Sequence, residues 1–315
     1  MRRYALRRVL AVPFMLLGVS VILFAIMHAA PGGPEAVLMG GNLDQATAAR
    51  IRANLGLDRP LPVQYVDWLL ALLHGNWGNS YLTGEPVTRM IMEHLGPTLE
   101  LTLVAVLVAL VVAVPAGVVA SVRPDSWFDR LSSAAAFAGI SFPSFWLGIM
   151  LILLFASYLH WLPVEGISSI TGGGIWDRLR HLILPAVTLA STQIASLLRF
   201  TRSSMMEAIQ QEYVRTARAK GLTERVVIYK HALRNALLPV VTVLGLSLSF
   251  IVGGAVLIET VFAWPGVGQL AVQSVFSRDY PVIMGVNVMI AAVVIVGNLV
   301  TDLTYALIDP RIGYE

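Results

Sequence analysis

The chain has 315 residues, of which 57% are hydrophobic and only 13% are charged, and its mean hydropathy is +0.73. A soluble domain needs a larger polar fraction to cover its surface, so this composition excludes an ordinary soluble protein. The formal net charge of +3 could indicate a nucleic-acid partner, but basic residues in so apolar a chain usually set membrane topology. Cysteine is absent, which excludes disulfides and thiol chemistry.

Long stretches without charged residues predict transmembrane helices. A helix needs roughly 20 apolar residues to cross the hydrocarbon core, whereas a membrane-spanning strand alternates apolar and polar residues over about 10 positions. The uncharged stretches of this chain are apolar on every face, which favours helices. We therefore expect an all-α integral membrane protein with six transmembrane helices. The six stretches are Val9–Met27, Leu101–Val122, Leu131–Leu159, Leu182–Leu198, Asn235–Ile258 and Tyr280–Thr301.

The distribution of arginine and lysine predicts the topology. If both the N- and C-termini are cytoplasmic, most of the 22 basic residues fall in cytoplasmic segments, as the positive-inside rule requires. The first apolar stretch is too long for the core of a typical signal peptide, so we expect an uncleaved anchor. The sequence thus predicts a multi-pass protein of the cell (inner) membrane, with residues 309–315 as a cytoplasmic tail.

The N-terminal third is expected to hold a flank and first transmembrane helix (residues 1–30) and an extracytoplasmic segment (31–97). Asn42 can cap a helix that ends at Leu55, and Pro62 can open a second helix that ends at His74. One face of this second helix is apolar, and we expect it to pack on the outer surface of the helix bundle. The residues of that face are Val63, Val66, Leu69, Leu70 and Leu73.

Several kinds of chemistry are missing from the sequence. Neither lysine, Lys220 or Lys230, follows a glycine, as a phosphate-binding loop requires, and no two histidines stand at the helical spacing of a metal site. No predicted span carries a charge near its middle, although ion-driven carriers usually need buried ionisable groups there. We therefore expect no metal or cofactor in this chain and an energy source outside it. A carrier or channel that works alone, or a scaffold that transports nothing, remains as an alternative.

The segment between Arg199 and Arg234 is the most polar part of the chain and holds eight basic residues. Residues 207–220 contain neither proline nor glycine and favour a helix, which Gly221 can end in the left-handed conformation. Thr223 can cap a following helix, with Glu224 in its first turn. We expect a helix, a glycine corner and a second helix that project from the membrane. The residues alone allow docking to a partner or a topology signal held near anionic headgroups.

This segment resembles the EAA loop of ABC-importer permeases, whose pattern is E-A-A-x3-G-x9-I-x-L-P. The general pattern is met here at Ala217, Gly221 and Leu233 only, with Arg215 and Thr216 at the first two positions. The longer strings EYVRTARAKGL and HALRNALLPVVT look like the dipeptide/oligopeptide subfamily, the B-type binding-protein-dependent permeases. The strings LGLDRPLPVQY, ETVFAWPGVGQL and DPRIGY agree, so the resemblance covers nearly the whole chain.

The resemblance implies a type I ABC importer permease fold, with residues 98–308 as a five-helix permease core that includes a cytoplasmic coupling loop at 203–235. Such a subunit is not itself an enzyme. It translocates dipeptides or oligopeptides that an external substrate-binding protein delivers, beside a second homologous permease and above two ATPase subunits that use ATP and Mg. Membrane lipid surrounds it, and no nucleic acid is expected. Nickel, glutathione and oligosaccharide importers have similar permeases, so the cargo stays open.

The resemblance also implies site residues. The coupling helix and its corner, which would contact an ATPase, comprise Glu212, Tyr213, Arg215, Thr216, Ala217, Arg218, Lys220 and Gly221. Four polar residues in the spans could line a translocation path, or could instead form hydrogen bonds within and between helices. They are Ser141, Ser144, Gln193 and Ser247. The outer helices at 42–74 and the loop at 75–87 are expected, from their location, to contact the binding protein.

Overall fold

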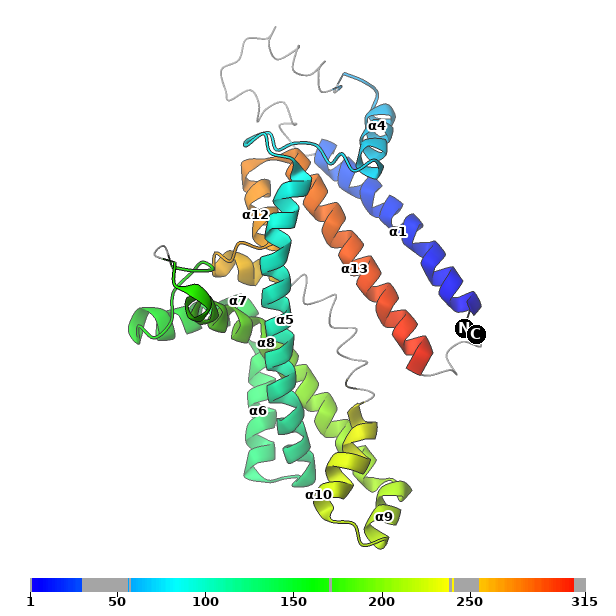
Figure 1. Ribbon diagram of the computed structural model, residues 1–315, viewed down its shortest axis with the longest axis vertical. Helices are drawn as coiled ribbons and strands as arrows, with labels where there is room; N and C mark the ends of the chain where they lie inside the picture. Colours follow the sequence, from blue (N-terminus) through cyan, green and yellow to red (C-terminus); the bar gives the residue numbers. More distant parts are fainter. Residues whose placement is uncertain are drawn as a thin grey trace. The chain divides into compact units, whose positions relative to one another are not determined.

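The computed structural model describes residues 2–29, 56, 58–169, 172–237, 240 and 255–308, with side chains described between residues 6 and 301. Over these residues the regular structure is helical, apart from one isolated bridge between Asn79 and Pro86, and the all-α prediction is confirmed. The chain divides into two compact units, Met1–Pro97 with Pro265–Glu315, and Thr98–Trp264. The helices of each unit are coloured along the sequence in Figure 1.

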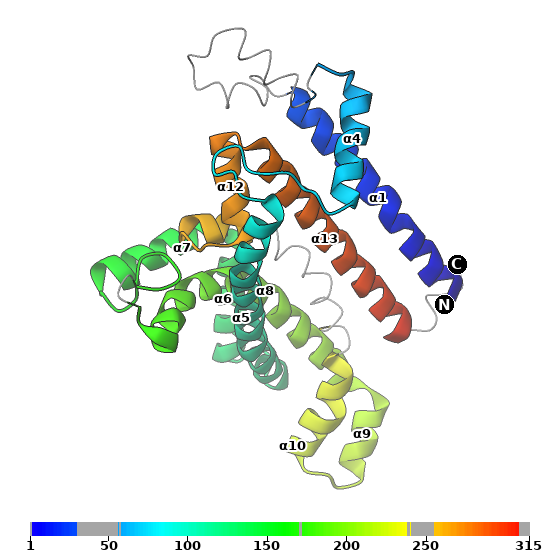
Figure 2. The ribbon, with the colours of Figure 1, turned by 45° about the horizontal axis from the view of Figure 1, so that its top comes forward.

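The first unit contains α1 (Arg2–Ala29), α4 (Leu61–Leu73), α12 (Val267–Ser277) and α13 (Tyr280–Ile308), together with the beginning of α5 (Val87–Val122). Helix α13 packs against both α1 and α12, and α4 packs on α1, as Figures 1 and 2 show. Apolar side chains from α5, α12 and α13 form the core of this unit. They are Val87, Ile91, Val267, Leu270, Val282 and Val286.

A buried aspartate holds the loop before α5 in place. Arg278 ends α12 in the left-handed conformation, with φ of 55°, and Asp279 follows at the start of α13. The Asp279 carboxylate accepts hydrogen bonds from the Ser80 hydroxyl and from the Tyr81 backbone N–H, the latter at 3.1 Å. These bonds satisfy a carboxylate that is only 3% exposed and fix the loop against the α12–α13 corner.

The second unit contains the rest of α5, α6 (Trp127–Ser141), α7 (Ser144–Leu151), the π-helical segment η1 (Ile152–Tyr158) and α8 (Gly174–Gln210). It also contains a small group formed by α9 (Glu212–Ala219), α10 (Glu224–Val226) and the π-helical segment η2 (Val227–Ala232). Helices α6 and α7 pack on α8. The fully buried residues of the main core include Leu101, Ala109, Ala113, Ala190, Leu197, Ile258 and Trp264.

Two features hold α8 firmly in the second unit. A Cβ atom at Gly117 of α5 would lie 2.7 Å from the Thr201 Cβ and 3.0 Å from the Leu198 carbonyl oxygen, so glycine permits a close crossing of α5 and α8. At the start of α6, the buried Asp129 accepts two hydrogen bonds from Arg202 of α8, at 2.5 and 2.8 Å. This bidentate pair ties α6 to α8.

Four helices are long and apolar enough to cross a membrane, namely Leu6–Ala29, Val87–Val122, Gly174–Gln210 and Tyr280–Thr301. They account for four of the six expected spans. The expected third span, Leu131–Leu159, is a pair of helices bent by 105° at Phe142 and Pro143, where proline breaks the helical hydrogen bonds. Most of the expected fifth span, Asn235–Ile258, lies outside the described residues. The six-helix count and the cytoplasmic termini therefore remain predictions.

Helix α4 confirms one expectation and corrects another. Its bounds agree with the predicted helix from Pro62 to His74 within one residue. The predicted packing face is wrong for four of its five residues. Leu69 is partly buried, but the other four side chains are exposed, by 42% (Val63), 49% (Val66), 49% (Leu70) and 72% (Leu73). The helix packs instead through its opposite side, where Tyr65 and Trp68 join an aromatic cluster with Phe24 of α1. The other outer helix expected, Asn42–Leu55, lies outside the described residues.

Candidate coupling site

The basic segment folds as a short helix set off from the end of a long one. Residue Gln211 has extended dihedral angles (φ −69°, ψ 149°) and lies between α8 and α9. The single continuous helix expected over residues 207–220 is therefore wrong, although neither proline nor glycine marks the break. The Gln211 carbonyl accepts the Val214 N–H at 3.0 Å, which starts α9 in a new direction. No residue type in this stretch signals the break, because glutamine is a good helix former.

The predicted glycine corner is confirmed. Gly221 has φ of +76°, its N–H donates to the Arg218 carbonyl at 2.9 Å, and the Leu222 N–H donates to the Ala217 carbonyl at 3.4 Å. These two bonds form a Schellman motif, which satisfies the last carbonyls of α9 and requires the left-handed conformation that glycine adopts at little cost. Thr223 precedes the next helix, as expected, but its side chain makes no capping hydrogen bond.

An apolar platform supports α9 from beneath. Val214 is fully buried and Ala217 is 5% exposed, and both belong to a cluster with residues of α8, η2 and α5. The other buried members of this cluster are Val118, Met205, Ala208, Val227, Ile228, Ala232 and Ala236. Because the platform draws on helices before and after the corner, α9 is held as part of a packed unit.

The outer face of α9 and the corner is polar and exposed. The side chains exposed to solvent on this face are those of Glu212, Tyr213, Arg215, Thr216 and the stretch from Arg218 to Val226. Two ion pairs organise this face. Arg215 donates to the Glu212 carboxylate at 2.7 Å within α9, where both side chains are more than two-thirds exposed. Such a pair contributes about 0–1 kcal/mol to stability, so Arg215 can exchange it for another partner at little cost.

The second ion pair crosses the corner. Arg218 donates two hydrogen bonds to Glu224, at 2.6 and 3.2 Å, and so links the end of α9 to the start of α10. Hydrogen bonding by the Arg218 guanidinium lowers the pKa of Glu224, and the carboxylate in turn raises the pKa of Arg218. The role of Glu224 as the partner of Arg218 was not foreseen from the sequence, because the six-residue separation becomes close only through the glycine corner.

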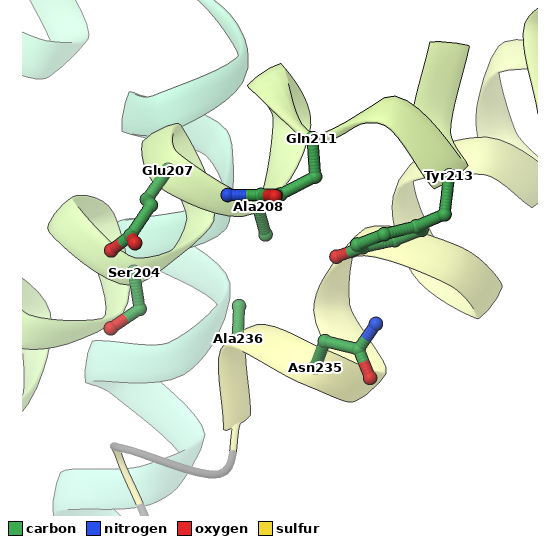
Figure 3. Close-up of a pocket in the computed structure, with 7 residues that line it drawn as sticks. All are labelled: Ser204, Glu207, Ala208, Gln211, Tyr213, Asn235 and Ala236. Atoms are coloured by element: carbon green, nitrogen blue, oxygen red, sulfur yellow. The ribbon is translucent and has the colours of Figure 1, made fainter. Parts of the chain in front are cut away.

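A pocket opens beside the start of α9, between α8 and the helical residues after η2. Its volume is about 270 Å³, and Figure 3 shows the Tyr213 side chain reaching from α9 toward its centre. A carboxylate, two amides, a phenol and a hydroxyl lie at its wall. The lining residues are Ser204, Glu207, Ala208, Gln211, Tyr213, Asn235 and Ala236. Apart from Tyr213, none of these was among the expected site residues.

Three of the four residues expected along a translocation path lie among the described residues. Ser141 and Ser144 flank the 105° bend between α6 and α7, and the Ser141 hydroxyl donates to the Phe137 carbonyl at 2.9 Å. Gln193 is partly exposed in α8, and Ser247 lies outside the described residues. The bond of Ser141 within its own helix is the alternative that the sequence left open for such residues. A role for any of the four in a path remains a prediction.

The described residues offer no metal site, since nowhere among them do three His, Asp or Glu side chains gather closely enough to hold an ion. The described part of the coupling site comprises a supported amphipathic helix, a glycine corner and a polar pocket. Its chemistry is that of a surface for another protein.

Comparison with known proteins assigns the chain to a family. Residues 113–314 match the family described as "Binding-protein-dependent transport system inner membrane component", and residues 1–102 match its N-terminal companion family. The chain is 44% identical over 316 residues to the oligopeptide transport system permease protein AppB of Bacillus subtilis, with 100% of both chains covered. It is 40% identical over 333 residues to the dipeptide transport system permease protein DppB of Alkalihalophilus pseudofirmus, again with 100% of both covered.

Other similar proteins include a permease named for a different cargo and a solved structure. The glutathione transport system permease protein GsiC of Salmonella typhimurium is 41% identical over 315 residues, with full coverage of both chains. Among solved structures, the MetNI methionine ABC transporter has a chain with a TM-score of 0.57 and 20% identity, which covers 70% of this chain and 97% of its own length. That similarity shows a shared fold. The chain is a multi-pass membrane protein that belongs to the family of inner membrane components of binding-protein-dependent transport systems.

Proposed function

We propose that this chain is the transmembrane permease subunit of an ATP-driven ABC importer that takes up dipeptides or oligopeptides. The observation that carries the proposal is the coupling site: an exposed, charged helix and glycine corner, supported by a buried apolar platform, in a member of this transport family. A polar helix that is held rigidly by its apolar face suits insertion into a groove of another protein. The relatives named for oligopeptide and dipeptide transport support the peptide cargo.

The partners follow from this function. The chain would pair with a second homologous permease, two ATPase subunits would supply the energy through ATP and Mg, and an external substrate-binding protein would deliver the cargo. The chain would need no ATP site of its own. Six spans with both termini cytoplasmic would place the coupling loop, residues 203–235, on the side of the ATPases. The anchor would then be residues 1–30. The outer segment would be residues 31–97, and the permease core would be residues 98–308.

The residues of the coupling site would have two kinds of role, contact with the ATPase and support of the helix and its corner. Glu212, Tyr213, Arg215 and Lys220 are exposed and would meet the ATPase surface directly. Thr216 donates its hydroxyl to the Glu212 carbonyl at 2.9 Å, and Ala217 and Gly221 shape the helix and its corner. Because Arg218 is engaged with Glu224, its first role would be to brace the corner. The pocket beside Tyr213 would accept one polar or cationic side chain of the partner.

Cargo is the part of the proposal with a specific rival. The identity with a glutathione permease is 41%, close to the 40% and 44% found with the two peptide permeases, so glutathione is the second candidate. Ser144 and Gln193, which are partly exposed, remain candidates for the translocation path, together with Ser141 and Ser247.

The proposed assembly is tested by gentle purification of the chain from its native membrane, with the co-purifying proteins identified by mass spectrometry. We expect a second permease and the ATPase subunits, with the binding protein recovered in the presence of cargo. Reconstituted vesicles should then take up labelled dipeptides or oligopeptides only with ATP, and unlabelled glutathione should compete poorly. Uptake by this chain alone, without ATP, would support the ion-driven carrier instead.

The docking role of α9 is tested by Arg215→Glu. Arg215 is 70% exposed, so the change should leave folding intact while it places a negative charge on the proposed contact face. We expect reduced recovery of the ATPase subunits with the permease. Arg89→Glu is the matched control, because Arg89 is 67% exposed and pairs with Glu93 one helical turn away in a similar ion pair. Equal recovery with the two variants would place the ATPase contact elsewhere.

A further inference from the structure

Helix α4 carries an apolar stripe with no protein neighbour among the described residues. Val63, Val66, Leu70 and Leu73 lie along one side of the helix at spacings of three and four residues, and each is at least 42% exposed. Asp67 borders the stripe and is paired with Arg59 at 2.8 Å. The helix is therefore amphipathic on its free side, with a charged edge next to an apolar face.

The contacts of α4 with α1 fix how deep this stripe lies. The membrane-crossing part of α1, Leu6–Ala29, has 24 residues and is therefore about 36 Å long, about 6 Å more than the hydrocarbon core. Ser20 precedes Ala29 by about 13 Å along the axis, so a centred α1 puts Ser20 about 10 Å inside the boundary of the acyl chains. A tilt of about 20° about the centre of the helix increases this depth by less than a tenth.

Helix α4 reaches down to that level. The Tyr65 hydroxyl is 2.9 Å from the Ser20 hydroxyl, and the Trp68 ring lies 6.0 Å from the Phe24 ring. At its upper limit, Gln64 is 3.2 Å from His28, which lies next to the end of α1. The contacts run from the headgroup boundary into the acyl region, and Figure 2 shows α4 beside the half of α1 that is remote from its first residue.

Three polar side chains where α4 packs on α1, those of Ser20, Gln64 and Tyr65, form hydrogen bonds within the protein, as a site without water favours. The Ser20 hydroxyl donates to the Leu17 carbonyl, and Ser20 is only 4% exposed. The Gln64 side chain donates to the Arg59 carbonyl at 2.7 Å in addition to its contact with His28. Tyrosine and tryptophan, here Tyr65 and Trp68, are also the side chains enriched where membrane meets water.

We propose that α4 is an interfacial helix that lies in the leaflet at the Ala29 end of α1, with its apolar stripe against lipid acyl chains. Depth, internal pairing of polar groups and the charged edge at Asp67 all favour lipid over a protein surface as the occupant. Residues 61–73 would thus be a second membrane anchor beside α1, although their length is too short to cross a bilayer.

Spin labelling tests this proposal, because the chain has no natural cysteine and each new one is unique within it. Val66→Cys and Leu70→Cys would be labelled with a nitroxide in the complete transporter, reconstituted in phosphatidylethanolamine and phosphatidylglycerol vesicles. Collision rates with oxygen, which enters lipid, and with a water-soluble nickel complex would be compared. Phe14→Cys on α1, 75% exposed, serves as the lipid reference, and Leu82→Cys, 58% exposed in the loop before α5, serves as the aqueous one in vesicles without binding protein. The unsubstituted chain corrects for label on partner subunits.

We expect both α4 labels to resemble Phe14→Cys, with oxygen collisions in excess of nickel collisions. Nickel accessibility like that of Leu82→Cys would overturn the proposal and place the stripe in water. An immobilised spectrum with low accessibility to both reagents would also overturn it, because a protein surface would then cover the stripe. None of these outcomes depends on transport activity, so the result is independent of the proposed import function.

Discussion

Gly221→Val is the sharpest test of the coupling site. Gly221 has φ of +76°, and a Cβ built on it meets no atom within 4 Å. The substitution therefore adds conformational strain without a steric clash. A left-handed residue with a Cβ costs about 1–2 kcal/mol, and a β-branched residue is a clear outlier there. The two backbone bonds of the Schellman motif are the ones this strain opposes.

This strain energy is small compared with the stability of the whole protein, but it is large enough to change the conformation of the corner. A strain of about 1.4 kcal/mol reduces the fraction of molecules with an intact corner by up to tenfold when an alternative conformation of similar energy exists. The apolar platform under α9 does not depend on Gly221, so the chain should still insert and assemble. We expect ATP hydrolysis to continue while peptide uptake per ATP falls by about the same factor.

The assay measures ATP hydrolysis and labelled-peptide uptake in the same reconstituted vesicles. Gly172→Val is the matched control, because Gly172, two residues before α8, has φ of +68° and also meets no atom within 4 Å. It should strain the chain equally without touching the coupling site. Full uptake per ATP by Gly221→Val, or equal loss in both variants, would refute the reasoning.

Two further predictions concern stability and pH. Gly117→Ala should lower the free energy of unfolding of the purified protein by about 1–3 kcal/mol, the usual cost of overpacking a core, and should therefore lower its melting temperature. The reason is that the new methyl group would lie 2.7 Å from Thr201. Gly96→Ala on the same helix meets no atom within 4 Å and should change the melting temperature little; equal effects would mean that α5 and α8 do not cross closely at Gly117. Since the Arg218 guanidinium lowers the pKa of Glu224, the ion pair across the corner contributes its full stability above the ordinary glutamate pKa, and this contribution is lost as pH falls from there through the lowered pKa. NMR of labelled glutamate, with Glu224→Gln to assign the signal, should show a titration midpoint below the usual range that returns to it in Arg218→Ala.

Local signals predicted the corner well because its cause is local. Gly221 follows a stretch of helix formers, and only glycine takes the left-handed conformation there at low cost, so the helix end could be placed to the residue. The same holds for the start of α4, where Pro62 fits the first turn of a helix. Apolar length alone identified the spans that the described helices confirm.

Features that depend on distant partners were not predictable. The side on which α4 packs depends on Tyr65 and Trp68 meeting Phe24, about forty positions away, and the apolar pattern alone favoured the wrong face. The bidentate contact of Asp129 with Arg202 likewise joins residues that no spacing rule connects. The break at Gln211 has no breaker residue, and it depends on the apolar platform that draws Val214 inward.

The structure explains how a push on the coupling site would reach the membrane. Helix α8 runs without a break from Gly174 to Gln210, and α9 follows after one extended residue. Flexible attachment at Gln211 alone would absorb a displacement, but Val214 and Ala217 are locked to Met205 of α8 through the shared platform. Closely packed segments move together as a rigid body. The ion pair between Asp129 and Arg202 joins α6 to α8, so α6 would move with α8 and α9. Motion of α9 would therefore be carried by α8 and α6 together, so that in the proposed importer a displacement imposed by a partner at α9 would reach these helices.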